Sequence, residues 1–160
     1  MPKGVMNWYL PPKAKIYEAL SALGDGRVTI ITNTSAQVVS SAGNKTYDIE
    51  WSEDGSKITS NDNASYWQGY LGYPIVAVLM ARSVISFDHA VAKQLAGIPW
   101  KDVNTKFRNN YDKAVQQVLG DVELRGGSPE AVIKEVDLIY AQLEGMGLGR
   151  MARRKLPPKA

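Results

Sequence analysis

The segment that follows Pro74 constrains the fold more than any other part of this 160-residue chain. From Ile75 to Ala81 it is apolar without interruption. Proline is favoured in the first turn of a helix, so we expect a helix that begins at Pro74 and runs to about Ile85. A helix that is apolar on every side must be buried nearly all round. The rest of the chain must therefore supply elements that cover it.

A β region precedes this helix. Within residues 45–51, Tyr47, Ile49 and Trp51 alternate with polar residues, which indicates a strand with one buried and one wet face. The dipeptide Asp54-Gly55 favours a tight hairpin after it. We expect three or four antiparallel strands in a meander, at residues 28–32, 36–41, 45–51 and 57–60.

Helical periodicity dominates the remainder of the chain. A helix opened by Pro12 precedes the β region, and a short helix follows residues 86–88, which offer an N-cap. From Trp100 onward, apolar residues repeat every three or four positions to about residue 125, which predicts one long amphipathic helix. Ser128-Pro129-Glu130 then starts a last helix. Its expected buried stripe is Val132, Ile133, Val136, Ile139, Tyr140 and Leu143.

These elements predict an α+β fold with an N-terminal helix, a three- to four-stranded antiparallel meander and C-terminal helices packed on one face. We expect residues 1–149 to form a single domain, because this length suits one hydrophobic core. Residues 150–160 follow a glycine-rich segment and contain Pro157-Pro158, so we expect a basic, disordered tail.

The positive charge of the chain is concentrated in this tail. The whole chain carries +3, and five cations with no acid lie in residues 150–160, which leaves −2 for residues 1–149. Arginine and lysine side chains can neutralise phosphates without reading sequence, so the tail is a candidate nucleic-acid contact. The alternative is a solvated terminus. The candidate contacts are Arg150, Arg153, Arg154 and Lys155.

Composition excludes several classes of site. The chain has no cysteine, so it has no disulfide, thiolate nucleophile or cysteine-bound metal. The beginning of the chain shows no apolar core of signal-peptide length, and no apolar run is long enough to span a bilayer. We expect a soluble, cytoplasmic protein that uses no cofactor and no membrane.

The most unusual composition lies in residues 60–74, which we call the aromatic loop. Four aromatic residues mixed with glycines precede the apolar helix. Such rings suit three roles: plain core packing, a protein-partner or self-association surface, and a small-ligand pocket. We expect Arg82 either to pair with a carboxylate, for which Asp62 is the natural candidate, or to extend out of the core at the edge of the helix. The candidate binding residues are Asp62, Tyr66, Trp67, Tyr70, Tyr73 and Arg82.

Three other patterns favour ordinary structural roles. His89 is the only histidine, and adjacent helical residues such as Asp88 do not face it. Asp48 and Glu50 share a strand face at a spacing that acid–base pairs use, but a solvated sheet face is the favoured explanation. The glycines of residues 145–149 follow a helix rather than a strand, unlike a dinucleotide loop. We therefore assign no catalytic residue and no metal ligand.

The segment Gly69-Tyr70-Leu71-Gly72-Tyr73-Pro74-Ile75, with the sheet before it and residues 97–100 after it, resembles a set of small archaeal proteins of unknown function. The resemblance covers about residues 16–111. It implies an archaeal, cytoplasmic setting and a widespread fold, and it implies no activity.

The sequence thus leaves the function open. Our first hypothesis is a non-enzymatic binding or interaction protein that uses the aromatic loop. A small enzyme or ligand-binding protein with a pocket at the same loop is the second hypothesis. A nucleic-acid accessory protein that acts through its tail is the third.

Overall fold

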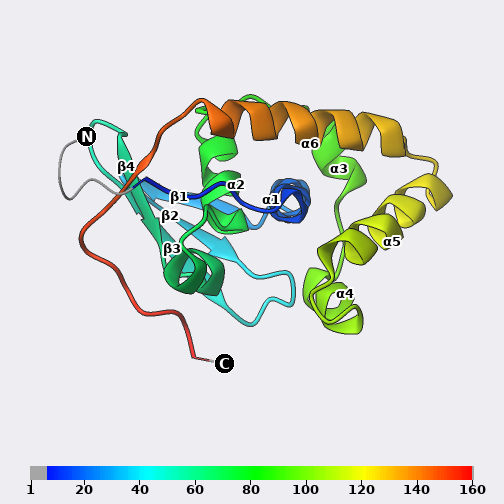
Figure 1. Cartoon of the computed structure of the whole chain (residues 1–160), viewed down its shortest axis with the longest axis horizontal. Helices are drawn as coiled ribbons and strands as arrows, with labels where there is room; N and C mark the ends of the chain where they lie inside the picture. Colours follow the sequence, from blue (N-terminus) through cyan, green and yellow to red (C-terminus); the bar gives the residue numbers. More distant parts are fainter. Residues whose placement is uncertain (1–6, 160) are drawn as a thin grey trace.

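A computed structural model describes residues 7–159 and shows the expected α+β fold (Figure 1). A sheet lies on one side of the molecule, two central helices lie beside it, and the remaining helices lie on the other side. In chain order the elements are α1 (Lys13–Gly24), β1 (Val28–Thr32), β2 (Ser35–Val39), β3 (Thr46–Trp51), β4 (Lys57–Ser60), η1 (Ala64–Gln68), α2 (Tyr73–Ala81), α3 (His89–Gln94), α4 (Trp100–Lys106), α5 (Tyr111–Leu124), α6 (Pro129–Glu144) and β5 (Gly149–Arg150).

The strands follow chain order in the sheet, from β1 to β5. The first four are antiparallel, as expected, and β5 pairs in parallel with β4. Ile49 and Trp51 of β3 are buried, whereas the Asp48 and Glu50 side chains on the opposite face are 33% and 44% exposed. The alternation in β3 therefore predicted the register correctly. Strand β5 was not predicted, because two residues carry no periodicity.

Helix α2 contacts β1 to β4 on one side and α1 on the other. Every residue from Pro74 to Met80 is buried, which confirms the expectation for an apolar helix. The helix ends at Ala81, four residues earlier than expected. Ser83 adopts a left-handed φ of 61°, and the N–H groups of Val84 and Ile85 donate to the carbonyl of Leu79, which closes the helix end.

The C-terminal helices pack on α1 rather than directly on the sheet, because α3, α5 and α6 all contact that helix. The expected long helix after Trp100 is broken into α4 and α5. Arg108 and Asn109 have φ of 53° and 61°, and the Asn110 side chain accepts a hydrogen bond from the Lys113 N–H as the N-cap of α5. Asparagine favours both the left-handed conformation and the N-cap, so the helix stops there.

Helix α6 begins as expected, with the Ser128 hydroxyl accepting from the Ala131 N–H. Its buried stripe is narrower than expected, because Ile133 is 41% exposed. Among the described residues, no helix is both long and apolar enough to cross a bilayer.

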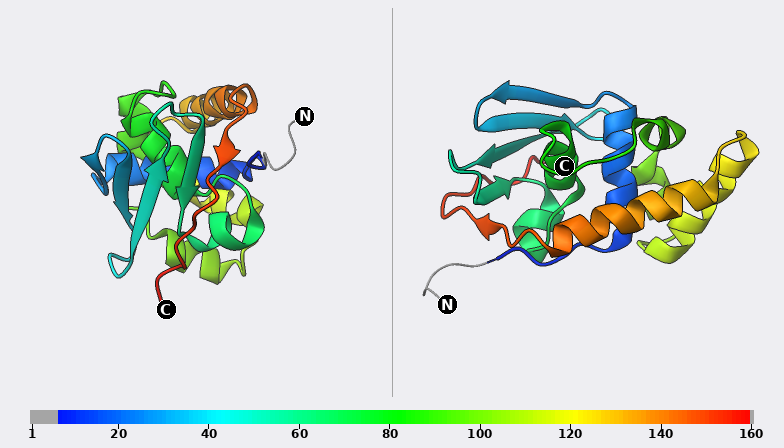
Figure 2. Two further views of the ribbon diagram at one scale, coloured as in Figure 1. Left: turned by 90° about the vertical axis from the view of Figure 1, so that its left-hand side faces the viewer. Right: turned by 90° about the horizontal axis from the view of Figure 1, so that it is seen from above.

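The chain after β5 runs along the outer side of the sheet, in front of the strands in the left view of Figure 2. Lys155 Nζ lies 3.6 Å from Asp48 Oδ2 and 3.8 Å from Glu50 Oε1. The Asn61 side chain donates to the Leu156 carbonyl at 3.3 Å. Lys155 thus lies against the acidic face of β3, and Arg150 belongs to the sheet itself.

Candidate functional site

A cavity of about 310 Å³ opens between α1, the loop after β2, the start of α2, and α4. We call it the polar pocket, because most of the side chains around it carry nitrogen or oxygen. Its lining includes Lys15, Glu18, Ser40, Ser41, Lys45, Tyr47, Asp62, Tyr73, Lys101, Asn104 and Asn109.

A charged pair on α1 lies at the inner side of the polar pocket. Glu18 is 6% exposed, and Lys15 Nζ lies 3.0 Å from its Oε2. Burial raises the pKa of the Glu18 carboxyl, and the charge of Lys15 offsets only part of this rise. Burial acts to lower the pKa of Lys15, but the charge of Glu18, the hydrogen bond to it and the nearby phenols of Tyr111 and Tyr70 together outweigh burial, and the pKa lies above its ordinary value. Each charge therefore depends on the other.

Two buried acceptor atoms beside the polar pocket lack a hydrogen bond of normal geometry. In the described part of the chain, four buried side-chain polar atoms have no hydrogen-bond partner, and two of them are Glu18 Oε2 and Asn104 Oδ1. The two side chains are neighbours, since Asn104 Nδ2 donates to Glu18 Oε1 at 3.5 Å. Nearly all buried polar groups in proteins are hydrogen-bonded. Glu18 Oε2 still faces the Lys15 ammonium at 3.0 Å, so Asn104 Oδ1 is the one of the two without a nearby donor.

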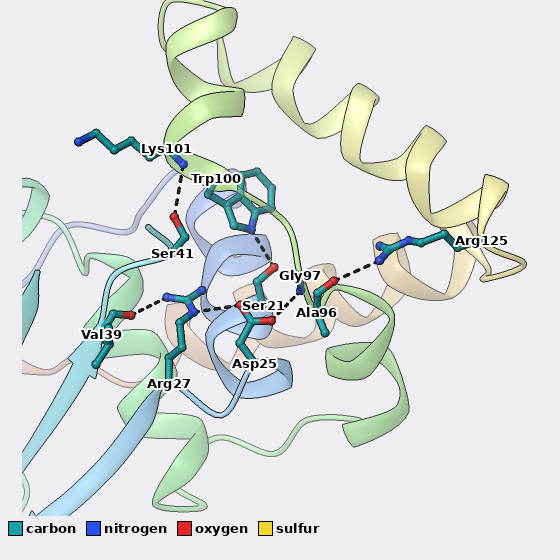
Figure 3. A network of polar contacts seen from close by, with 10 residues as sticks. All are labelled: Ser21, Asp25, Arg27, Val39, Ser41, Ala96, Gly97, Trp100, Lys101 and Arg125. Atoms are coloured by element: carbon teal, nitrogen blue, oxygen red, sulfur yellow. Dashed lines mark hydrogen bonds and ion pairs between the residues drawn. The ribbon is translucent and has the colours of Figure 1, made fainter. Parts of the chain in front are cut away.

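Two tyrosine rings form an aromatic wall. Tyr47 and Tyr73 meet edge to face, with ring centres 6.3 Å apart. Burial raises the pKa of both phenols, so both stay neutral at physiological pH. The guanidinium carbon of Arg27 lies 5.9 Å from the centre of the Tyr73 ring. Arg27 is itself fixed by donating to the Val39 carbonyl at 2.7 Å (Figure 3).

Polar contacts hold α4 in place at the rim. The Trp100 indole donates to the buried Ser21 hydroxyl of α1 at 2.7 Å, and the Lys101 N–H donates to Ser41 Oγ at 3.4 Å (Figure 3). These contacts bring Lys101 to the pocket beside Lys45. Neither lysine forms an ion pair within residues 7–159. The rim therefore carries uncompensated positive charge.

Asp62 lies in the pocket wall, but its oxygens are already engaged. Oδ1 accepts from the Ser60 hydroxyl at 2.5 Å and Oδ2 accepts from the Ser65 N–H at 3.0 Å. The Ser65 hydroxyl accepts in turn from the Gly72 N–H at 3.0 Å. A Cβ on Gly72 would overlap the Asp62 carboxylate, so glycine is required where α2 begins. Asp62 thus organises the turn that delivers Tyr73 to the pocket.

The rings of the aromatic loop do not all line the polar pocket. Of its four aromatic residues, only Tyr73 lines the polar pocket, and Trp67 is 67% exposed. Residues 64–68 of the loop form the π-helix η1, which ends at Gly69 with a φ of 74°. Single turns of π-helix occur frequently at functional sites.

Of the two outcomes expected for Arg82, the structure shows the side chain leaving the core and not the pairing with Asp62. The Arg82 guanidinium carbon lies 4.0 Å from the centre of the Trp51 ring, and Arg82 forms no ion pair in the described residues. Its position just after the last residue of α2 lets the side chain leave the core and stack on an aromatic face instead. Asp62 has no vacant oxygen to offer, because serine groups engage both.

A second cluster joins the tail to the N-terminal segment and the aromatic loop. The Arg150 guanidinium carbon lies 4.9 Å from the Trp8 ring centre, and that of Arg154 lies 4.4 Å from the Tyr66 ring centre. Arg150 also donates to the Gly69 carbonyl at 2.7 Å. Together with the exposed rings of Tyr9 and Trp67, 64% and 67% exposed, these residues form what we call the aromatic–arginine surface. Its members are Trp8, Tyr9, Tyr66, Trp67, Arg150 and Arg154.

Sequence reasoning missed Lys15, Glu18 and Asn104. One signal could have indicated that Glu18 is buried: it lies between Tyr17 and Ala19 in a helix whose residues are buried on most sides. His89 is exposed at the start of α3 and does not line the polar pocket. Within the described residues, no three histidine or acidic side chains are grouped to hold a metal ion.

The family model described as Uncharacterised conserved protein UCP014422 matches residues 8–149. The chain belongs to this family. Its matched range contains every residue of the polar pocket, whereas Arg153, Arg154 and Lys155 lie beyond it. No curated protein and no solved structure showed a significant match.

Proposed function

We propose that this member of the UCP014422 family binds a small anionic molecule in the polar pocket. The observation that carries the proposal is the buried pair of Lys15 and Glu18 beside a cavity that Lys45 and Lys101 also line. Replacing a buried ion pair by apolar residues is often neutral or stabilising, so such a pair is weak as a purely structural device. Charged groups with perturbed pKa values in a cleft are instead common at functional sites.

The negative charge proposed for the ligand follows from the charges around the cavity. Glu18 is compensated by Lys15, and the oxygens of Asp62 accept hydrogen bonds from serine groups. Lys45 and Lys101 are left without an acidic partner among the described residues. A phosphate or carboxylate at the rim would give each lysine a partner.

The test uses isothermal titration calorimetry and thermal shift of the full chain against inorganic phosphate, citrate and mononucleotides in a buffer without competing anions. Lys45→Ala with Lys101→Ala should abolish the heat and the shift in Tm that the wild type shows. A control with Lys93→Ala and Lys134→Ala removes two exposed lysines outside the pocket and should leave binding unchanged. Equal binding by both double variants would contradict the proposal.

A second candidate function is contact with single-stranded nucleic acid through the aromatic–arginine surface. The specific observation is that the fold brings the Trp8 and Tyr66 rings beside tail arginines that have no aromatic residue near them in the sequence. Aromatic rings stack bases, and cations follow the phosphate backbone. Asp48 and Glu50 oppose this, but Lys155 lies against both.

Fluorescence anisotropy of a labelled single-stranded oligonucleotide tests this candidate. Binding should weaken steeply with added salt and weaken further with Trp67→Ala, whereas Leu124→Ala, which removes an exposed apolar side chain elsewhere, should have no effect. If the oligonucleotide does not bind but Trp67→Ala reduces self-association in sedimentation velocity, the surface contacts protein instead. An archaeal origin and a cytoplasmic location also stay predictions.

A further inference from the structure

We infer that β1 is the contact surface for a second copy of this chain, and that two β1 strands pair antiparallel and join two sheets into one. Strand β1 stands at one end of the strand order and is the uppermost strand of the sheet in the right view of Figure 2. Residues 29–32 are exposed, and the side chains of Ile30 and Ile31 are 45% and 53% exposed. The inference does not depend on the polar pocket.

The two edges of the sheet differ. At the β5 edge, Asn7 forms an antiparallel bridge with Gly149, and the Trp8 N–H donates to the Leu148 carbonyl at 3.1 Å. Within residues 7–159, no strand or bridge covers the outer side of β1. Residues 28–32 read VTIIT and contain no charged residue and no proline, which are two of the devices that protect exposed edges from pairing. The β1 edge is therefore open to another strand.

The hydrogen bonds to β2 show which peptide groups of β1 point outward. The Val39 N–H donates to the Arg27 carbonyl at 3.0 Å, so the peptide groups of Arg27 face β2. Hydrogen-bonded and non-hydrogen-bonded positions alternate along an antiparallel pair, so the peptide groups of Val28 and Ile30 point to the open edge. The irregularity in the β1–β2 pairing comes after Ile30 and leaves both residues in regular strand.

A second copy fits this edge because the edge is self-complementary. With Val28 opposite Ile30 of the second copy, a two-fold axis passes through Thr29, and each pair of Val28 and Ile30 exchanges two hydrogen bonds. Both residues pair with buried residues of β2, so they lie on the helix-covered face, and the two apolar pairs extend that face. On the opposite face Thr29 meets Thr29 of the second copy, which is a favourable cross-strand pair. Arg27 lies opposite the uncharged Ile31, so no like charges meet.

Sedimentation velocity of the full chain at micromolar concentrations tests the pairing. The wild type should sediment with twice the mass of a single chain. Ile30→Pro removes an N–H that points to the open edge and keeps the hydrogen bonds to β2, so the fold should be retained in circular dichroism. Each copy then loses an intermolecular hydrogen bond, and the dimer should weaken at least about tenfold. Trp67→Ala, on the aromatic–arginine surface, should leave the dimer intact.

A cysteine at position 29 tests the register, because the chain has no cysteine of its own. The two Thr29 residues form a pair without hydrogen bonds, whose Cα atoms lie about 4.5 Å apart, and a disulfide can span this distance. Under mild oxidation Thr29→Cys should form a covalent dimer. Leu124→Cys, at an exposed position in α5, is the matched control and should stay monomeric on a non-reducing gel.

The inference is overturned if the wild type sediments as a monomer, since the β1 edge would then be left to another protein or to none. It is also overturned if Thr29→Cys cross-links no faster than Leu124→Cys. A dimer that persists in Ile30→Pro would have the same consequence, and its loss in Trp67→Ala would place the contact at the aromatic–arginine surface. If Ile30→Pro does not fold, the rate of the Thr29→Cys cross-link decides.

Discussion

Variants of Lys15 and Glu18 test most directly whether these two charges stabilise each other beside the polar pocket. The Lys15 side chain is 11% exposed and the Glu18 side chain is 7% exposed. Removing one partner from a buried pair leaves the other charge without compensation and costs about 3–5 kcal/mol. The cavity lets water approach this pair, so we expect the lower end, about 3 kcal/mol, for Lys15→Met or for Glu18→Leu.

In a chain of this length each kcal/mol lowers Tm by about 2–4 °C, so each single variant should melt about 6–12 °C below the wild type. The double variant removes both charges and should regain most of this loss, because a neutral apolar pair carries no desolvation penalty. Thermal and guanidinium denaturation followed by circular dichroism measure the four corners of the cycle. The double variant should also lose every ligand-induced shift in Tm.

The exposed pair of Lys13 and Asp137 is the matched control. Its side chains are 53% and 55% exposed, and the same cycle there should show a far smaller coupling. The reasoning is refuted if the losses of Lys15→Met and Glu18→Leu simply add in the double variant. The reasoning is equally refuted if both single variants have the same Tm as the wild type.

Three further predictions concern stability. Gly72→Ala should lower Tm, because its Cβ would overlap the Asp62 carboxylate. Gly120→Ala in α5 has open space around it and should raise Tm slightly. A Gly72→Ala variant as stable as the wild type would show that the turn can move. Stability should fall above about pH 10, where the unfolded chain begins to lose phenol protons. Burial raises the pKa of Tyr70 to about 12 and also raises that of Tyr73 above its ordinary value, so the folded state keeps these protons to higher pH. This contribution is complete below about pH 10 and is lost as the pH rises through the folded pKa, and Tyr70→Phe should flatten the decline in Tm between pH 9 and pH 12. A chain that ends at Arg150 should still fold, with unchanged far-ultraviolet circular dichroism, because β5 is retained; loss of the α+β spectrum would show that residues 151–159 belong to the folding unit.

Local chemistry made much of the fold predictable. The two-residue alternation of residues 46–51 and the Asp54-Gly55 turn specified β3 and β4, because a strand with one buried face has only one acceptable register. The apolar segment after Pro74 specified a buried helix, and Ser128 specified where α6 begins. The break at Arg108 and Asn109 was not predicted, because the apolar repeat continues past these two residues. Their positive φ angles nevertheless interrupt the helix.

The candidate site was predictable only in part. Of the candidate binding residues, Asp62 and Tyr73 line the polar pocket, whereas Tyr66, Trp67, Tyr70 and Arg82 do not. Lys15 and Glu18 look like an ordinary i, i+3 pair on a helix surface in the sequence.

The sequence by itself determined which segments are strands and helices, because propensity, periodicity and capping act between neighbours in the chain. Only the tertiary structure decided that Glu18 is buried, since α4 brings Asn104 to it from 86 residues away. The same holds for Arg150 and Arg154, whose aromatic partners Trp8 and Tyr66 come from distant segments. Burial and stacking depend on which surfaces meet, and long-range packing sets that.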